Sequence, residues 1–569
     1  MTPPSIPKAL PLPAHSRRQR IRERGRTFTA ALVAAALVAT PVARFPLVSA
    51  AAAQSPANAG EPSGELRKYG SIPPVPTPPP ALPDSGEIQK YGAIGTPVVP
   101  LSPSQKLPDL GDASQALMSP AQERKLGEAI VRQIRAGGGY LEDAEVNDYL
   151  NEIGNRLVTA TRDVRQDFLF FAVPDPGINA FALPGGYIGV NTGTILLAQT
   201  ESQLASVLAH EISHVTQHHI TRGMASQQNV LLTTLAGLAL AIIASKVGGS
   251  QSGQATSAAI AGTQALAVQQ QINFTRENEF EADRVGFSRL VAAGFDPNAM
   301  SELFDRLQRA SRFSEGGMPA YLRDHPVTYE RVAEAKSRAQ DLPYKQVPDS
   351  LNFHMVRALL QSYQGDAREQ VANFDRAIAE KKYNNEIAGQ YGLVAALLRA
   401  KDMPRAKVEL AKLEKIAPPH PMVEAIAGNV LMESGAYPAA VARFESALTR
   451  YPNKMQLIHD YPEALIKAGR PADAAAFAER ELVRYPAEGP LHEIAARAYS
   501  ALDKRLKQHE HQGEYYAWAG NLPLAIEQFQ LAVKSGDGDF YQMSVVETRL
   551  RALRQEKAEQ EKVGFGPAG

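Results

Sequence analysis

The chain has 569 residues, and its 60 basic residues balance its 60 acidic residues, so its formal net charge at pH 7 is zero. A balanced charge gives no indication of nucleic acid or of a strongly acidic partner. The chain has no cysteine, which excludes disulfide bonds and attachment of lipid to a cysteine, and thiols therefore give no information about the redox compartment.

The N-terminus has the pattern of an unusually long secretory signal peptide, which we assign to residues 1–53. Six arginines lie between positions 17 and 26, an apolar run covers residues 30–38, and four alanines precede residue 54. These are the basic, apolar and small-residue parts of such a signal. A retained membrane anchor is the alternative, but the apolar run is much shorter than the roughly 20 residues that span a bilayer. The signal predicts the periplasm of a Gram-negative bacterium.

The next segment, residues 54–113, is predicted to be a disordered linker, because it is rich in Pro, Gly and Ser and too poor in apolar residues to form a core. Within it, Glu-Leu-Arg-Lys-Tyr-Gly at 65–70 recurs as Glu-Ile-Gln-Lys-Tyr-Gly at 87–92. The repeat is either a docking peptide or a duplication without function. A folded domain over residues 114–345 follows, opening with a helix that Ser119 caps.

A small β-sheet is expected in the first part of this domain. Residues 168–173 are strand-like, and residues 179–194 predict a hairpin with Gly185 and Gly186 at its turn. An extended peptide can bind along the edge of a sheet, so an edge strand here is a candidate binding site for one. The alternative is an ordinary core sheet, and the two interpretations are compatible.

The sequence His-Glu-Ile-Ser-His at 210–214 is the most informative motif of the chain. Residues four apart on a helix lie on one face, about 6 Å apart along the axis, so His210 and His214 can reach the same ion. A helix is predicted, because Thr200 and Gln203 have the spacing of a capping box and apolar residues recur at helical intervals before Gly223.

Glu211 lies beside this ion without having to bind it, and is the candidate general base. Zinc with three protein ligands and an open position lowers the pKa of its water to about 7. The position ten after His210 is Ile220 rather than a third histidine, so the third ligand must come from another segment. The alternative is a chance match in an amphipathic helix.

Residues 230–244 form an almost unbroken apolar run, followed by a stretch rich in Gly, Ser, Gln and Ala. The run is shorter than a membrane span. We predict that this segment forms a helical hairpin, which either covers the active-site cleft as a lid or touches a membrane surface. The alternative is a buried core helix.

A second helical segment, residues 276–286, carries four acidic residues within one or two turns. Glu279 is a candidate third ligand, and Asp283, one turn further on the same face, can accept the free N–H of a ligating histidine. Glu277 and Glu281 form a rival pair that spacing alone does not exclude. A solvated acidic face is the alternative for each of them.

A third segment reads His-Pro-Val-Thr-Tyr-Glu-Arg at 325–331. If the ring of His325 reaches the ion, it fills the position that water needs and closes the site. The alternatives are a residue that faces the substrate or one that begins a helix. For Arg331 the hypothesis is stabilisation of the oxyanion of the tetrahedral intermediate, with a surface ion pair as the alternative.

From about residue 350 to 555 the chain is rich in alanine and has a period of 34 residues. Alanines at 406, 440 and 474, prolines at 418, 452 and 486, and glycines at 435 and 469 keep this interval. The pattern predicts tetratricopeptide repeats, whose stacked helix pairs form a superhelix with a concave protein-binding face. Gly520 and Ala525 repeat the offset of Gly435 and Ala440 after an insertion of about 17 residues, and Ala372 indicates another unit upstream.

The three ordered motifs resemble the zinc peptidase family that includes the CAAX prenyl proteases, HtpX and BepA, over about residues 115–340. That family has His-Glu-x-x-His followed by Glu-x-x-x-Asp, and its soluble members add His-Pro-x-x-x-x-Arg. The resemblance selects Glu279 over its rivals. It implies that zinc, one per chain, is bound by His210, His214 and Glu279, with Asp283 supporting the ligands. It also implies that His325 is a gating fourth ligand.

The predicted fold class is mainly α: an α+β zincin-like metallopeptidase domain with a small β-sheet, followed by an α-helical tetratricopeptide-repeat superhelix. The predicted function is that of a periplasmic zinc endopeptidase that hydrolyses protein clients recruited by its repeats. The resemblance suggests as partners misassembled outer-membrane proteins and their assembly machinery, at the outer membrane. The alternative is a chaperone-like scaffold with a latent or silent site.

Overall fold

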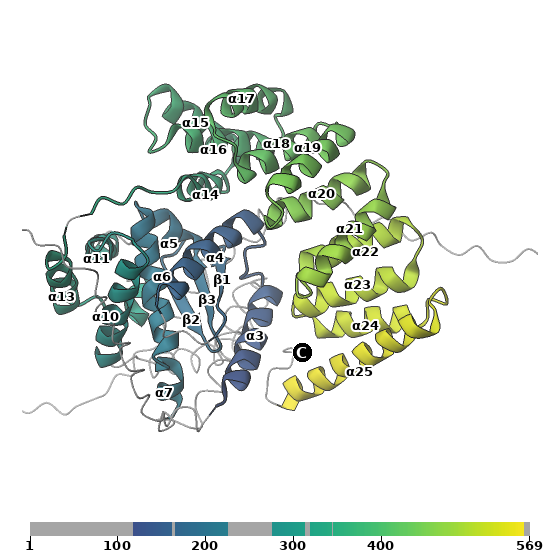
Figure 1. Ribbon diagram of the computed structural model, residues 1–569, viewed down its shortest axis with the longest axis horizontal. Helices are drawn as coiled ribbons and strands as arrows, with labels where there is room; N and C mark the ends of the chain where they lie inside the picture. The colour runs from purple at the N-terminus through teal and green to yellow at the C-terminus, as the bar shows by residue number, and fades with distance from the viewer. Residues whose placement is uncertain (1–117, 162–165, 226–275, 313–318, 344, 563–569) are drawn as a thin grey trace, which may run out of the picture. The chain divides into compact units, whose positions relative to one another are not determined.

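The computed structural model describes residues 118–161, 166–225, 276–312, 319–343 and 345–562. Figure 1 shows a domain of helices and a small sheet, residues 120–340, which we call the mixed domain. An array of helices follows it. The predicted signal peptide 1–53, the linker 54–113 with its repeated motif, and the apolar run 230–244 lie outside the described residues.

The sheet has three strands, β1 (Leu169–Val173), β2 (Ala180–Leu183) and β3 (Tyr187–Asn191), in the order β1-β3-β2. β2 and β3 form the predicted antiparallel hairpin, and β1 pairs with β3 in parallel. Gly185 and Gly186 have φ values of +74° and +85°. Residues with a Cβ atom rarely adopt such values, so the turn requires glycine. In the strand order formed by the described residues, β2 lies at one edge of the sheet.

Helices pack against the sheet (Figure 1), and one of them carries the His-Glu-Ile-Ser-His motif. Helix α6 (Glu201–Thr216) is the central helix of this domain, and each of its residues from Glu201 to Val215 is buried. It packs against α4, α10, α11 and β2. The other helices of the domain are α3 (Pro120–Ala136), α4 (Ala144–Thr159), α5 (Thr192–Leu197), α7 (His219–Ala225), α10 (Arg276–Ala292), α11 (Ala299–Arg312), α12 (Ala320–Asp324) and α13 (Tyr329–Gln340).

The N-termini of α3 and α6 can be compared with the two capping boxes predicted from the sequence. Ser119 and Gln122 form the predicted capping box of α3. Thr200 caps α6 by accepting from the backbone N–H of Gln203, but the Gln203 side chain bonds to residue 199 instead of completing the box. The prediction that this helix continues towards Gly223 is wrong: α6 ends at Thr216, and α7 begins at His219.

The C-terminal part is the predicted array of helix pairs, which follows a curve from α14 to α25 in Figure 1. Gly435 and Gly469 have φ values of +77° and +76° at the turns within two pairs. The helices are α14 (Leu351–Ser362), α15 (Ala367–Ala379), α16 (Glu386–Ala400), α17 (Met403–Ile416), α18 (Pro421–Glu433), α19 (Tyr437–Arg450), α20 (Met455–Lys467), α21 (Pro471–Arg484), α22 (Gly489–Ala501), α23 (Arg505–Trp518), α24 (Leu522–Val533) and α25 (Phe540–Lys562).

The predicted insertion of about 17 residues corresponds to one additional helix and leaves the array regular in spacing. From α18 onward each helix starts 16 to 18 residues after the one before. Gly428 on α18 packs against the ring of Phe444 on α19, and Gly513 on α23 packs in the same way against Phe529 on α24. The glycine that packs against a phenylalanine of the next helix therefore changes from the even-numbered to the odd-numbered helices, while the helices continue to stack at the same spacing. The upstream unit is α14 and α15, although Ala372 itself is exposed.

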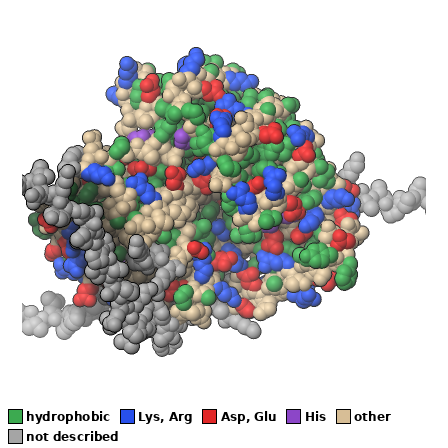
Figure 2. Space-filling view, viewed as in Figure 1, with side chains coloured by type: hydrophobic (Ala, Val, Ile, Leu, Met, Phe, Trp, Pro, Cys, Tyr) green, Lys and Arg blue, Asp and Glu red, His purple; other side chains and the backbone are tan. Residues whose placement is uncertain are grey.

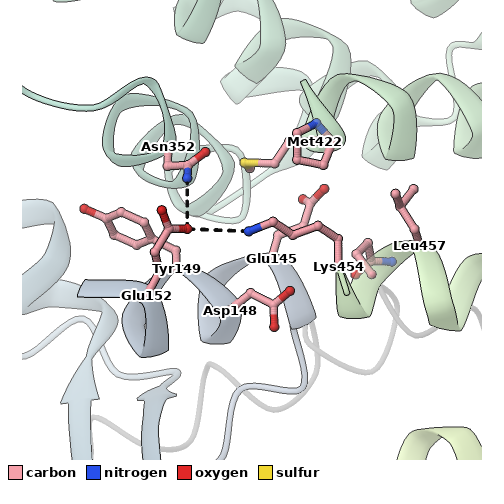
Figure 3. Close-up of a pocket in the computed structure, with 10 residues that line it drawn as sticks. Glu145, Asp148, Tyr149, Glu152, Asn352, Met422, Lys454 and Leu457 are labelled. Atoms are coloured by element: carbon pink, nitrogen blue, oxygen red, sulfur yellow. Dashed lines mark hydrogen bonds and ion pairs between the residues drawn. The ribbon is translucent and has the colours of Figure 1, made fainter. Parts of the chain in front are cut away.

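The repeat array contacts the mixed domain through α4. Asp148 accepts a hydrogen bond from the backbone N–H of Met455 at the start of α20, at 3.0 Å. Glu152 contacts Asn352 at 3.2 Å and Lys454 at 3.5 Å in a pocket between these elements (Figure 3). Burial raises the pKa of Asp148 to about 6, although the Met455 N–H and Lys454 oppose this shift.

The surface bears out the balanced composition. Figure 2 shows basic and acidic side chains interspersed on the visible face of the repeats, without a field of one sign. Among the described residues, no helix combines the length and the apolar character that crossing a membrane requires.

Candidate metal centre

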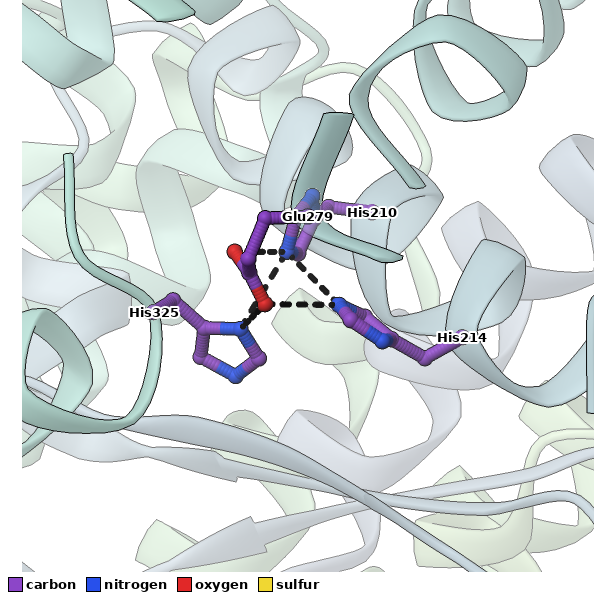
Figure 4. Close-up of side chains that lie close together, drawn as sticks. All are labelled: His210, His214, Glu279 and His325. Atoms are coloured by element: carbon purple, nitrogen blue, oxygen red, sulfur yellow. Dashed lines mark hydrogen bonds and ion pairs between the residues drawn. The ribbon is translucent and has the colours of Figure 1, made fainter. Parts of the chain in front are cut away.

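Three helices bring four buried side chains to one point (Figure 4). His210 and His214 lie one turn apart on α6, Glu279 lies on α10, and His325 directly follows α12. One ligand atom from each of the four lies within 4.8 Å of all the others. Each of these residues is at most 3% exposed.

The spacing of these atoms fits a tetrahedral metal ion. Ligands at about 2.0–2.1 Å from such an ion lie about 3.4 Å from one another. The two Nε2 atoms of His210 and His214 are 3.0 Å apart, and the Glu279 carboxylate lies 3.6 and 3.5 Å from them. Two imidazoles and a carboxylate are a ligand set that suits zinc.

A carboxylate and a guanidinium hold these ligands in place. Asp283 Oδ1 lies 2.9 Å from Nδ1 of His210, the ring nitrogen that faces away from the cluster. Arg331 on α13 contacts both oxygens of Asp283, at 2.6 and 2.8 Å, and Oε2 of Glu279 at 2.7 Å. The Arg331 side chain is 1% exposed, so its guanidinium lies behind the ligands. This position favours a supporting role over the predicted contact with an oxyanion.

Glu211 lies beside the cluster as predicted for a base. Its carboxylate is buried and accepts a backbone hydrogen bond from Ala182 on the edge strand β2. Its Oε1 atom has no hydrogen-bond partner among the described residues and lies 3.6 Å from Nε2 of His325. Burial raises the pKa of Glu211, and this is the direction that brings a carboxylate towards a proton-accepting role near neutral pH.

His325 occupies the fourth corner of the cluster. Its Nδ1 atom lies 2.9 Å from Glu279 Oε1 and 3.3 Å from His210 Nε2. The ring packs against Tyr321, with a distance of 4.9 Å between centroids. His325 therefore ends a helix rather than beginning one, and its ring points at the cluster (Figure 4).

The rival carboxylates on α10 lie elsewhere. Glu277 is exposed, and Glu281 is 39% exposed and contacts His219 and Arg222, each at 3.1 Å. Glu279 is the member of this acidic segment that joins the cluster, because its face of α10 packs against α6.

Two residues of the site have no place in the sequence prediction. Gly286 lets α10 approach α6 closely, because a Cβ there would lie 3.1 Å from the carbonyl oxygen of Ala209. His219 lies 3.0 Å from His214 through their Nδ1 atoms. Its place five residues after His214, beyond the end of the helix, gave no helical spacing from which to predict this contact.

The protonation states favour metal binding at two of the ligands. Burial lowers the pKa of His214 well below its usual value, so its ring stays neutral. Burial opposes ionisation of Glu279, but His325 and His210 outweigh it and hold its pKa well below the usual range. Burial also opposes protonation of His210, but Asp283 and Glu279 raise its pKa to about 10. A proton therefore competes with a metal at His210.

Comparison with known proteins agrees with this geometry. Residues 144–339, which contain the whole cluster, match the family model described as Peptidase family M48. The chain is 31% identical to the beta-barrel assembly-enhancing protease of Escherichia coli (strain K12) over 450 residues, 79% of this chain and 91% of that protein. It is 38% identical to the putative beta-barrel assembly-enhancing protease of Vibrio cholerae over 321 residues, 55% of this chain and 64% of that protein.

More distant matches cover single parts of the chain. The mitochondrial metalloendopeptidase OMA1 of Schizosaccharomyces pombe is 27% identical over 217 residues, 38% of this chain and 59% of that protein. A crystal structure of the P58(IPK) TPR domain matches 64% of this chain and 96% of its own, at 13% identity and a TM-score of 0.15. That likeness carries no argument about the fold, so the repeat assignment depends on the helix pairs themselves. From the peptidase match and the 31% identity across 91% of a curated relative, we conclude that this chain belongs to peptidase family M48 and is a metallopeptidase.

Proposed function

We propose that this protein is a periplasmic zinc-dependent endopeptidase that hydrolyses peptide bonds of proteins recruited by its repeats, in quality control of outer-membrane protein assembly. One observation carries the proposal: four buried ligand atoms lie within 4.8 Å of one another, with the carboxylate of Glu211 beside them. The names of the Escherichia coli and Vibrio cholerae relatives support the assembly role, and the signal-like N-terminus supports the periplasm.

In this proposal His210, His214 and Glu279 hold the zinc. Bound zinc polarises the scissile carbonyl and lowers the pKa of a water to about 7. Glu211 accepts the proton of the attacking water and returns it to the leaving amine. Its Oε1 atom makes no hydrogen bond to the described residues and its pKa is raised, and both features suit this task. Asp283 keeps the N–H of His210 on Nδ1, so that Nε2 offers its lone pair to the ion.

The edge strand β2 is the proposed binding site for the substrate backbone. Within the described residues β2 pairs with β3 alone, which leaves its other edge open, and its residue Ala182 contacts Glu211. An extended peptide added along this edge would place its backbone beside the base with little selectivity for side chains. The concave face of the repeats would recruit the client proteins.

His325 is the proposed gate. Its Nδ1 atom lies where a fourth ligand would lie, and a site with four protein ligands has no position for water. The same observation supports the second candidate function, a chaperone-like scaffold whose peptidase site is latent. Under the first function, the ring leaves when a client binds.

Two measurements test the proposed function. Purified mature protein should bind about one zinc per chain, and Glu279→Gln should bind much less, while Glu277→Gln, at an exposed carboxylate on the same helix, serves as the control. Wild type should cleave casein, and Glu211→Gln, which keeps the shape of the side chain, should not. No zinc after reconstitution would reject the peptidase proposal. Zinc without cleavage would favour the scaffold.

A further inference from the structure

His214 has a supporting histidine of its own, which the proposed mechanism does not use. The Nδ1 atoms of His219 and His214 lie 3.0 Å apart, and the two rings are nearly perpendicular, with centroids 4.9 Å apart. The other ring nitrogen of His219, Nε2, lies 3.1 Å from Oε2 of Glu281. His219 is 1% exposed, so these contacts are made inside the protein.

The number of protons on Glu281, His219 and His214 sets the direction of the two hydrogen bonds that join them. A neutral imidazole carries one N–H and one lone pair. The Glu281 carboxylate can only accept, so the proton of His219 lies on Nε2. The Nδ1 atom of His219 must then accept the Nδ1–H of His214. That leaves the lone pair of His214 on Nε2, the atom that faces the cluster.

We propose that Glu281 and His219 are positioning residues, which fix the tautomer and orientation of His214 for metal binding. The inference rests on the proposed zinc site and deepens it. In this arrangement each histidine ligand has its own support: Asp283 holds His210, and the pair of Glu281 and His219 holds His214. A carboxylate that orients a ligating histidine is a common arrangement in metal sites, and here a second histidine extends it.

The backbone between the two helices supports this inference. His218, just before His219, has a φ of +54°, a left-handed conformation that is uncommon for residues other than glycine. This turn ends α6 and sends the ring of His219 back onto His214. Arg222, one turn along α7, contacts the same Glu281 oxygen at 3.1 Å and holds the carboxylate in place.

The test is the zinc affinity of the full-length protein, measured by competition with a chromophoric chelator. His219→Phe keeps a planar ring but removes the acceptor, so the zinc affinity should fall 10- to 100-fold, which is typical for loss of a residue that supports a ligand. His219→Gln restores an acceptor oxygen and should recover part of this loss. Glu281→Ala should lower the affinity in the same direction. The double variant His219→Phe/Glu281→Ala should be no worse than His219→Phe alone, because Glu281 acts through His219.

The control is Glu277→Ala, an exposed carboxylate on the same helix, which should leave zinc affinity unchanged. A purely structural role of His219 would lower the melting temperature of the metal-free protein and would not be rescued by His219→Gln. Wild-type zinc affinity in His219→Phe, or additive losses in the double variant, would overturn the inference. Absence of zinc from wild type would instead overturn the proposed function, so the two failures are distinguishable.

Discussion

Replacement of Arg331 distinguishes a supporting residue from one that contacts the transition state. The guanidinium is 1% exposed and makes three short contacts with carboxylates, two with Asp283 and one with Glu279. Methionine has a similar length and no charge, so Arg331→Met removes the guanidinium from both buried carboxylates and leaves them only their contacts with histidines. Arg331→Lys keeps the charge but cannot reproduce the planar fork of donors that spans two carboxylates.

The expected loss is large, because breaking a buried ion pair by removing one partner costs about 3–5 kcal/mol. A hydrogen bond to a charged group contributes about 1.5–3 kcal/mol, so Arg331→Lys should lose at least one such contribution. Hydrogen exchange of the full-length, metal-free proteins measures the effect locally, as the opening free energy of the amides of α10 and α13. Zinc affinity should fall in parallel, because Asp283 and Glu279 lose the partner that orients them.

The matched control is Arg284→Met. Arg284 on α10 contacts Glu334 on α13 at 2.7 Å, so it joins the same two helices, but its side chain is 55% exposed. Solvent screens such a pair, and its loss should barely change the exchange. The supporting role would be refuted if Arg331→Met matched the control both in protection of its amides from hydrogen exchange and in zinc affinity. A fall in kcat alone would favour the oxyanion hypothesis.

Three further predictions use other parts of the molecule. Burial raises the pKa of Glu211, so the acid limb of kcat/KM should lie at higher pH than an ordinary glutamate allows; a limb near pH 4.5 would contradict Glu211 as the base. His325→Ala should raise basal casein cleavage severalfold, because the fourth corner opens; an unchanged or abolished rate would remove the gating idea. Asp148→Asn should raise the free energy of unfolding by up to about 3 kcal/mol at pH 8 but not at pH 4. The reason is that a folded-state pKa of about 6, above the usual 3.8, makes the ionised group lower stability as pH rises through that range. Urea unfolding at both pH values checks this, and equal differences would contradict it.

The sequence alone determined the features that depend on local spacing. Two histidines four apart on a helix must share a face, so His210 and His214 were predictable as a pair with Glu211 beside them. Gly185 and Gly186 marked the turn between β2 and β3 for the same kind of reason, because only glycine readily adopts their positive φ. The 34-residue period predicted the repeat helices because each unit buries the same face against its neighbours.

The choice among the acidic residues of α10 required the tertiary structure. Glu277, Glu279 and Glu281 are two residues apart, and each step of two turns the side chain to another side of the helix. The close approach of α10 to α6 at Gly286 decides which side faces the histidines. The family resemblance selected Glu279, but the spacing of residues within the segment did not.

Contacts between segments far apart in the sequence were likewise decided only by the fold. The ring of His325 completes the cluster from the end of α12, and the guanidinium of Arg331 lies behind the ligands rather than in front of them. His219 reaches His214 because the chain reverses at His218. Helical periodicity is a property of neighbouring residues, whereas the packing of one helix against another depends on every side chain at the interface. The sequence therefore predicted the two histidine ligands on α6, but it did not predict how Arg331 and His219 are placed against the ligands.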